Sequence, residues 1–241
     1  MIPSPHHRAP RIPAASTVLF DLDGTLTDPK EGITRSVQYA LKALGRPVPP
    51  MEDLLWTIGP PLRWNFVKLL GSEERADEGV RLYRERFAEI GMFENDLIEG
   101  IPALLDELLA EGRRLYVATS KPHLFARRIV EHFGLTDRFV AVYGSELDGT
   151  NADKRDLFRT ILAKEDFEPA EAVMVGDREH DVIGAMASGI PTIGVRWGYG
   201  SDEELLSAGA AVLVDRPAEI AALLDEAGPF SPARPARGAA G

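Results

Sequence analysis

The stretch Thr17-Val18-Leu19-Phe20-Asp21-Leu22-Asp23-Gly24-Thr25 places two acids directly after a short apolar run. The run is typical of a buried β-strand, and strand alternation sends the side chains of Asp21 and Asp23 to the same side. Gly24 permits a tight turn of the backbone, and Thr25 adds a hydroxyl nearby. The sequence therefore predicts a metal and phosphate site here, in which one carboxylate attacks while the other moves a proton.

Five further apolar runs of strand length follow along the chain, at residues 115–118, 139–142, 172–175, 192–195 and 211–214. Each is apolar on both faces, which is typical of a parallel sheet covered by helices on both sides. From Ile101 onward, apolar residues at helical spacing separate these runs, so the pattern predicts an α/β fold with a doubly wound parallel sheet. Such a sheet binds ligands at the carboxyl ends of its strands, where Asp21, Thr119 and Asp177 are expected to converge.

Between Asp28 and Glu99 the sequence shows helical periodicity and no evident strand. We therefore predict a helical cap over residues 29–98, inserted into an α/β catalytic core formed by residues 16–28 and 99–227. Because the insertion begins just after the first two acids, it is expected to cover the site. Residues 1–15 and 228–241 are rich in proline or poor in apolar residues, and we expect them to be disordered tails.

Composition limits the classes of function. The 241 residues are 44% hydrophobic, enough for a packed core, and the absence of cysteine excludes disulfides and thiolate metal sites. A formal net charge of −11 argues against a nucleic-acid polymer as partner. No apolar run approaches the roughly 20 residues that a membrane span needs. We expect a cytoplasmic protein without a membrane partner; its oligomeric state cannot be determined from the sequence.

Three later motifs complete a possible phosphate site. The hydroxyl and backbone N–H groups of Thr119-Ser120 suit a phosphoryl oxygen, and Lys154 offers a cation to offset phosphate charge. Asp177 and Asp181 lie four positions apart at the start of a helix; beside the first two acids they would form a site for Mg²⁺. Each motif alone also fits a helix cap or a solvated surface residue.

In their order and spacing, these four elements resemble the four motifs of the haloacid dehalogenase superfamily, over roughly Thr17 to Ala227. The resemblance implies a Rossmann-like core with a helical cap. It implies that Asp21 is the nucleophile, which forms an aspartyl-phosphate, and that Asp23 is the general acid and base. Dehalogenases of the superfamily lack an acid at the position of Asp23, so phosphate transfer is favoured over carbon–halogen cleavage.

The resemblance also assigns the remaining roles. Mg²⁺ would be held by the carboxylates of Asp21 and Asp177 and the backbone carbonyl of Asp23, while Asp181 would support the metal or its waters. Phosphoryl oxygens would be held by Thr119 and the N–H of Ser120. Lys154 would position the nucleophile and balance charge.

Substrate clues are less specific. Thr119-Ser120-Lys121-Pro122 and the segment 144–150 look like the phosphoglycolate phosphatase-like branch that includes 5′-nucleotidase-like members. Arg63 follows a proline-rich turn between cap helices, where contact with a substrate anion and surface ion pairing are equally compatible with the sequence. The three tryptophans could stack on a base or pack in the core; they are Trp56, Trp64 and Trp197.

The leading prediction is a Mg²⁺-dependent phosphomonoesterase that acts on a small phosphorylated metabolite. A nucleoside 5′-monophosphate and phosphoglycolate are the foremost candidates. Two alternatives remain open: a phosphomutase, which returns the phosphoryl group to the product, and a non-catalytic protein that senses a phosphate ligand.

Overall fold

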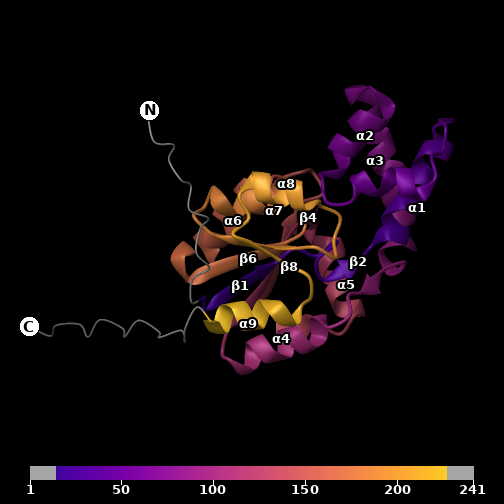
Figure 1. The fold of residues 1–241 in the computed structure, drawn as a ribbon. Coiled ribbons are helices and arrows are strands. Elements are labelled where there is room, and N and C mark those ends of the chain that lie inside the picture. The colour runs from indigo at the N-terminus through magenta and orange to yellow at the C-terminus, as the bar shows by residue number, and fades with distance from the viewer. Residues whose placement is uncertain (1–14, 227–241) are drawn as a thin grey trace, which may run out of the picture.

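A computed structural model describes residues 15–226, and its strands and helices alternate along most of that range (Figure 1). The strands are β1 (Thr17–Phe20), β2 (Thr27–Asp28), β3 (Asp96–Leu97), β4 (Arg114–Pro122), β5 (Ala141–Ser145), β6 (Ala172–Gly176), β7 (Thr192–Val195) and β8 (Val212–Val214). The α-helices are α1 (Lys30–Ala43), α2 (Leu62–Leu70), α3 (Glu73–Phe87), α4 (Ile101–Ala110), α5 (His123–His132), α6 (Lys154–Lys164), α7 (Glu179–Met186), α8 (Asp202–Ala208) and α9 (Ala218–Glu226). Short 3₁₀ helices include η1 (Met51–Thr57) and η2 (Gly91–Phe93).

The main sheet has six strands in the order β5-β4-β1-β6-β7-β8, and every neighbouring pair is parallel. Thr17 of β1 pairs with Arg114 of β4 on one side and with Ala172 of β6 on the other. From β1 the chain builds outward to β5 and then returns to build the other half. The predicted doubly wound sheet is confirmed, with its switch point at β1.

Strand alternation distributes the core over two faces of this sheet. Val18 and Phe20 belong to the hydrophobic cluster that includes residues of α4, α5 and α9, whereas Leu19 packs with residues of α6. Figure 1 shows α4 and α9 on one face, and α6 and α7 on the other. Since both faces are covered, the central residues of these strands are mostly apolar.

The helices α1, α2 and α3 lie to one side of the sheet (Figure 1). Aromatic contacts join α3 to the core: the rings of Tyr83 and Phe87 stack with centroids 5.2 Å apart, and Phe87 meets Phe125 of α5 edge to face at 5.5 Å. The hydrophobic cluster of the sheet therefore continues into the helical segment.

The prediction that no strand lies between Asp28 and Glu99 was wrong. β2 and β3 form an antiparallel pair at the two ends of the helical segment, with Thr27 opposite Leu97 and Asp28 opposite Asp96. Each strand has two residues, too few to show an alternating pattern, and the pair forms only because the insertion returns to its point of departure.

The predicted tails at 1–15 and 228–241 lie outside the described residues, except for Ala15, which is buried. Among the helices of residues 15–226, none combines the length and apolar character needed to cross a membrane.

Candidate active site

The turn after β1 fixes the first two acids. The backbone N–H of Asp21 donates to the Val175 carbonyl of β6 at 2.9 Å, which continues the sheet to the end of the strand. Gly24 then adopts a φ of +83°, and a Cβ placed there would lie 2.3 Å from Oδ2 of Asp177. Only glycine fits this position, because both the backbone conformation and the neighbouring acid exclude a side chain.

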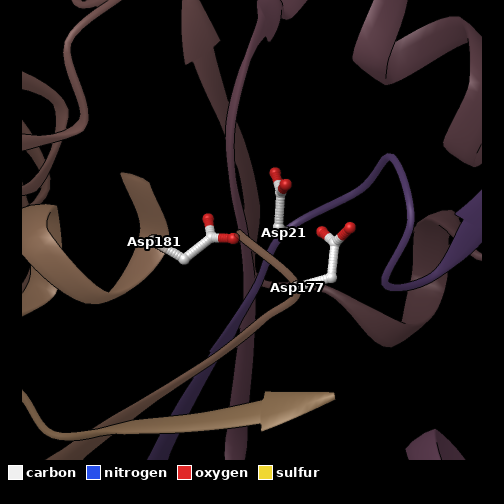
Figure 2. Close-up of side chains that lie close together, drawn as sticks. All are labelled: Asp21, Asp177 and Asp181. Atoms are coloured by element: carbon white, nitrogen blue, oxygen red, sulfur yellow. The ribbon is translucent and has the colours of Figure 1, made fainter. Parts of the chain in front are cut away.

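Three carboxylates from distant segments meet at the carboxyl ends of β1 and β6. Figure 2 shows Asp21, Asp177 and Asp181 close together, and one carboxylate oxygen from each residue lies within 4.8 Å of those from the other two. All three residues are buried. Like charges at this separation are unfavourable without a cation, so the cluster is chemically suited to a hard divalent metal ion.

Asp177 is held by neighbours on both of its oxygens. Oδ1 accepts a hydrogen bond from the Thr25 hydroxyl at 3.3 Å, and Oδ2 accepts one from the Tyr199 backbone N–H at 2.8 Å. Burial raises its pKa well above the ordinary value, and the charges of Asp181 and Asp21 add to the shift. Burial is also the main cause that raises the pKa of Asp181 to about 6, although Lys154 opposes the shift.

Lys154 supplies the cation among these acids. Its Nζ lies 2.9 Å from Oδ1 of Asp21, donates to Asp181, and donates to the Ala118 carbonyl at 3.0 Å. The contact with Asp21 is an ion pair whose alignment does not make a hydrogen bond, since that oxygen has no hydrogen-bond partner within residues 15–226. Burial lowers the pKa of Lys154, but the two carboxylates more than offset it, so the net pKa is raised.

Asp23 lies apart from the three-acid cluster and pairs with Lys121. Its Oδ2 is 2.9 Å from the Lys121 Nζ, which also lies 4.4 Å from the centre of the Phe87 ring of α3. Burial raises the pKa of Asp23, and the positive charge of Lys121 acts against that shift. Its Oδ1 is buried and has no hydrogen-bond partner among the described residues. A raised pKa suits a group that must carry a proton to a leaving oxygen.

Thr119 and Ser120 lie in an irregular part of β4. The strand continues to Pro122, beyond the predicted end at Ala118, and its pairing with β5 changes register between those two residues. The Thr119 hydroxyl accepts a hydrogen bond from the Lys121 backbone N–H at 3.2 Å, and the Ser120 carbonyl accepts one from the Ser145 hydroxyl at 2.9 Å. Because β4 runs parallel to β1, with Val117 opposite Phe20, both residues lie at the sheet end that carries the acids.

A loop from the helical segment is fixed to the core by Arg178. The Arg178 guanidinium donates to the Ile58 carbonyl and to Oε1 of Glu204, the latter at 2.8 Å. At Gly59, where φ is +101°, a Cβ would lie 2.9 Å from Arg178 Cγ. The proline-rich loop therefore passes directly over the motif that contains Asp177.

Arg63 makes ion pairs on the surface. Its guanidinium lies 3.0 Å from Glu73 and 2.9 Å from Asp77, and half of its side chain is exposed. It also lines a cavity of about 450 Å³ that reaches Ser120. The structure thus places Arg63 at the rim of a cavity while its donors are engaged by acids of α3.

Three cavities meet at Ser120, which lines each of them. One of about 60 Å³ is lined by Asp23, Lys121 and residues of α3. One of about 500 Å³ lies between the proline-rich loop and the starts of α6 and α7, and reaches Lys154. Each of the three cavities is also lined by Pro60 or Pro61 of the proline-rich loop.

The sequence predicts that the four motifs lie at one end of the sheet, and the structure has them there. Several contacts around these motifs could not be predicted. The sequence does not indicate that Lys121 pairs with Asp23, and it gives no sign that Tyr199 supports Asp177. Both contacts join residues far apart in sequence. For the contact between Lys121 and Asp23, the only signal in the sequence is the run Thr119-Ser120-Lys121-Pro122.

Comparison with known proteins agrees with this geometry. The family model for haloacid dehalogenase-like hydrolases matches residues 18–195. A 5′-nucleotidase of Pseudomonas aeruginosa is 52% identical over 189 residues, covering 78% of this chain and 86% of the relative. The tyrosine-protein kinase PtkA of Mycobacterium tuberculosis is 44% identical over 183 residues, covering 76% of this chain and 62% of the relative.

A solved structure is similar to this chain in fold as well as in sequence. The crystal structure of a predicted phosphatase from Clostridium acetobutylicum has a TM-score of 0.84 and 44% sequence identity, and the match covers 87% of this chain and 98% of that one. The family match spans most of the chain and includes all four motifs, from Asp21 to Asp181. The chain therefore belongs to the haloacid dehalogenase-like hydrolase family, as its motifs predicted.

Proposed function

We propose that this phosphatase of the haloacid dehalogenase-like family is a Mg²⁺-dependent phosphomonoesterase, with nucleoside 5′-monophosphates as its foremost substrates and Asp21 as its nucleophile. The observation that carries the proposal is the separation of the two acids of the first turn. Asp21 lies among the metal-type carboxylates with Lys154, whereas Asp23 pairs with Lys121 beside a cavity. The 5′-nucleotidase relative supports the substrate, and phosphoglycolate remains the second candidate.

In the first step, the Asp21 carboxylate attacks phosphorus and the bond from phosphorus to the leaving oxygen breaks. Asp23 gives its proton to that oxygen, so the product leaves as a neutral alcohol. The raised pKa of Asp23 favours the protonated form that this step requires. Thr119 and Ser120 hold the phosphoryl oxygens at the end of β4.

In the second step, Asp23 acts as a base. Its carboxylate accepts a proton from water, and the water oxygen attacks the phosphorus of the aspartyl-phosphate. Asp21 leaves as a carboxylate, inorganic phosphate is released, and Asp23 is protonated again. Lys121 stabilises the ionised form of Asp23 that accepts the proton.

The three-acid cluster fits Mg²⁺. Its members are buried, offer oxygen ligands, and include an Asp21 oxygen that has no hydrogen-bond partner within residues 15–226. We propose that Asp21, Asp177 and the backbone carbonyl of Asp23 hold the ion, with Asp181 supporting it. When bound, Mg²⁺ would offset the negative charges of the phosphate and of the carboxylates.

The test measures free phosphate released from nucleoside monophosphates, phosphoglycolate, sugar phosphates and pyridoxal phosphate, with Mg²⁺ or with chelator. Metal-dependent release by the wild type, absent in a folded Asp21→Asn variant, is the expected result. Equal release by that variant would reject Asp21 as the nucleophile.

Other outcomes identify the alternatives. Isomerised sugar phosphate without free phosphate would indicate a mutase, and tight binding without turnover at any metal concentration would indicate a sensor. Incubation with ATP and tyrosine-containing peptides tests for the activity that the mycobacterial relative's name describes.

A further inference from the structure

The 500 Å³ cavity contains an aromatic cluster that the chemistry described above does not use. Trp56 of η1 and Trp64 of α2 meet edge to face, with ring centroids 6.0 Å apart and planes at 80°. The Nζ of Lys68 lies 4.2 Å from the centre of the Trp56 ring and 5.1 Å from that of Trp64. All three residues line the cavity, which reaches Ser120 and Lys154 at the phosphate site.

Packing accounts for only part of this cluster. Trp64 is 52% exposed although it lines a concave surface. Within residues 15–226, neither its indole N–H nor that of Trp56 donates a hydrogen bond, and no carboxylate pairs with Lys68. Trp197 differs, because it packs against the hydrophobic core and its indole N–H donates to the Thr25 carbonyl at 3.1 Å. These residues form an exposed aromatic surface with unpaired indole N–H groups and a cation that contacts the rings but, among the described residues, no carboxylate. Such a surface suits a flat, polar, anionic ligand.

Cavity size and lining decide where a nucleoside could lie. The 60 Å³ cavity beside Asp23 is too small, since cavities for ligands of nucleoside size usually measure about 300–1,000 Å³. The 450 Å³ cavity offers arginines and acids but, among the described residues, no aromatic ring. The 500 Å³ cavity offers two tryptophans, and aromatic rings bind bases of any sequence by stacking.

We propose that Trp64, supported by Trp56 and Lys68, forms a subsite for the heteroaromatic base of a nucleoside 5′-monophosphate whose phosphate lies at Asp21. This inference rests on the proposed function and specifies its substrate class. The base stacks on Trp64, and Lys68 faces acceptor atoms of the base or the ribose. A phosphate ester without a base gains nothing from this subsite.

The first test compares AMP, GMP, CMP and UMP with ribose 5-phosphate, which lacks the base. Trp64→Ala is expected to lower kcat/KM for the nucleotides by about 5- to 150-fold, the range expected from loss of one base stack, and to leave ribose 5-phosphate within about twofold of the wild type. Trp64→Phe should retain most of the activity. Tyr39→Ala, which removes another partly exposed aromatic ring from α1, is the matched control and should change neither substrate. An equal loss for both kinds of substrate would overturn the subsite.

A second test does not depend on turnover. In Asp21→Asn, AMP is expected to quench tryptophan fluorescence, and Asp21→Asn with Trp64→Phe should lose most of that quenching; inorganic phosphate should quench neither. Nucleotide hydrolysis without any effect of Trp64 would retain the proposed function and overturn the subsite. Quenching through Trp64 without hydrolysis by the wild type would retain the subsite and overturn the proposed function. Neither hydrolysis nor quenching would overturn both.

Discussion

Replacing Lys154 with methionine removes the only cation that contacts Asp21 and Asp181 within the described part of the chain. The Lys154 side chain is 3% exposed, and its Nζ lies 2.9 Å from Oδ1 of Asp21. Breaking a buried ion pair by removing one partner costs about 3–5 kcal/mol, because the remaining charge stays buried. For a domain of this size each kcal/mol lowers Tm by about 2–4 °C, so the metal-free variant should melt about 6–20 °C below the wild type.

Added Mg²⁺ and a lower pH should each reduce the difference in Tm between Lys154→Met and the wild type. Mg²⁺ binding to the three acids would replace the missing cation, so added Mg²⁺ should raise the Tm of Lys154→Met more than that of the wild type. Burial raises the pKa of Asp181 to about 6 and that of Asp177 well above its ordinary value. Acids whose pKa is higher in the folded than in the unfolded protein stabilise the fold at low pH and lose that effect as the pH rises through the folded pKa. At pH 5 these acids are more often protonated and have less need of a cation, so the Tm difference between Lys154→Met and the wild type should be smaller at pH 5 than at pH 8.

The assay is thermal unfolding followed by circular dichroism, with chelator and with Mg²⁺, at both pH values. Lys164→Met is the matched control, because Lys164 lies at the exposed end of the same helix; its effect should stay within about 0.5 kcal/mol. If Lys154→Met in chelator melts within about 2 °C of this control, the reasoning about the buried cation is refuted.

Three further predictions concern single side chains. Lys121→Met removes the positive charge that opposes the effect of burial, so it should raise the pKa of Asp23 and move the acidic limb of the kcat profile to higher pH; an unmoved limb would show that Asp23 does not control it. Gly32→Ala places a Cβ 1.9 Å from a carbonyl oxygen of η2 and should cost about 1–3 kcal/mol in urea unfolding; an unchanged free energy of unfolding would contradict this close contact. Glu94→Gln should destabilise the protein at neutral pH, because hydrogen bonds from arginines of α3 and α1 lower the pKa of this carboxyl. That stabilisation is lost as the pH falls through the lowered pKa, so the two proteins should converge in acid, and a constant difference would contradict the ion-pair explanation.

The sequence by itself determined the sheet and the positions of the candidate site residues. Strands covered on both faces carry runs of apolar residues, so all six strands of the main sheet could be recognised. Parallel strands also end at one edge, which is why Asp21, Thr119 and Asp177 could be placed together from the sequence alone. These predictions depend on local patterns and on the general geometry of the fold.

Only the tertiary structure decided what surrounds those groups. The partner of Asp23 lies on β4, the backbone N–H that supports Asp177 belongs to Tyr199, and the pairing of β2 with β3 spans the whole helical insertion. Trp64 of α2 lines one cavity together with residues at the starts of α6 and α7. Such contacts join segments that lie tens of residues apart, and neither segment carries a periodic sequence pattern that indicates the contact. They can be identified only in the folded protein, where packing has fixed the distances between elements.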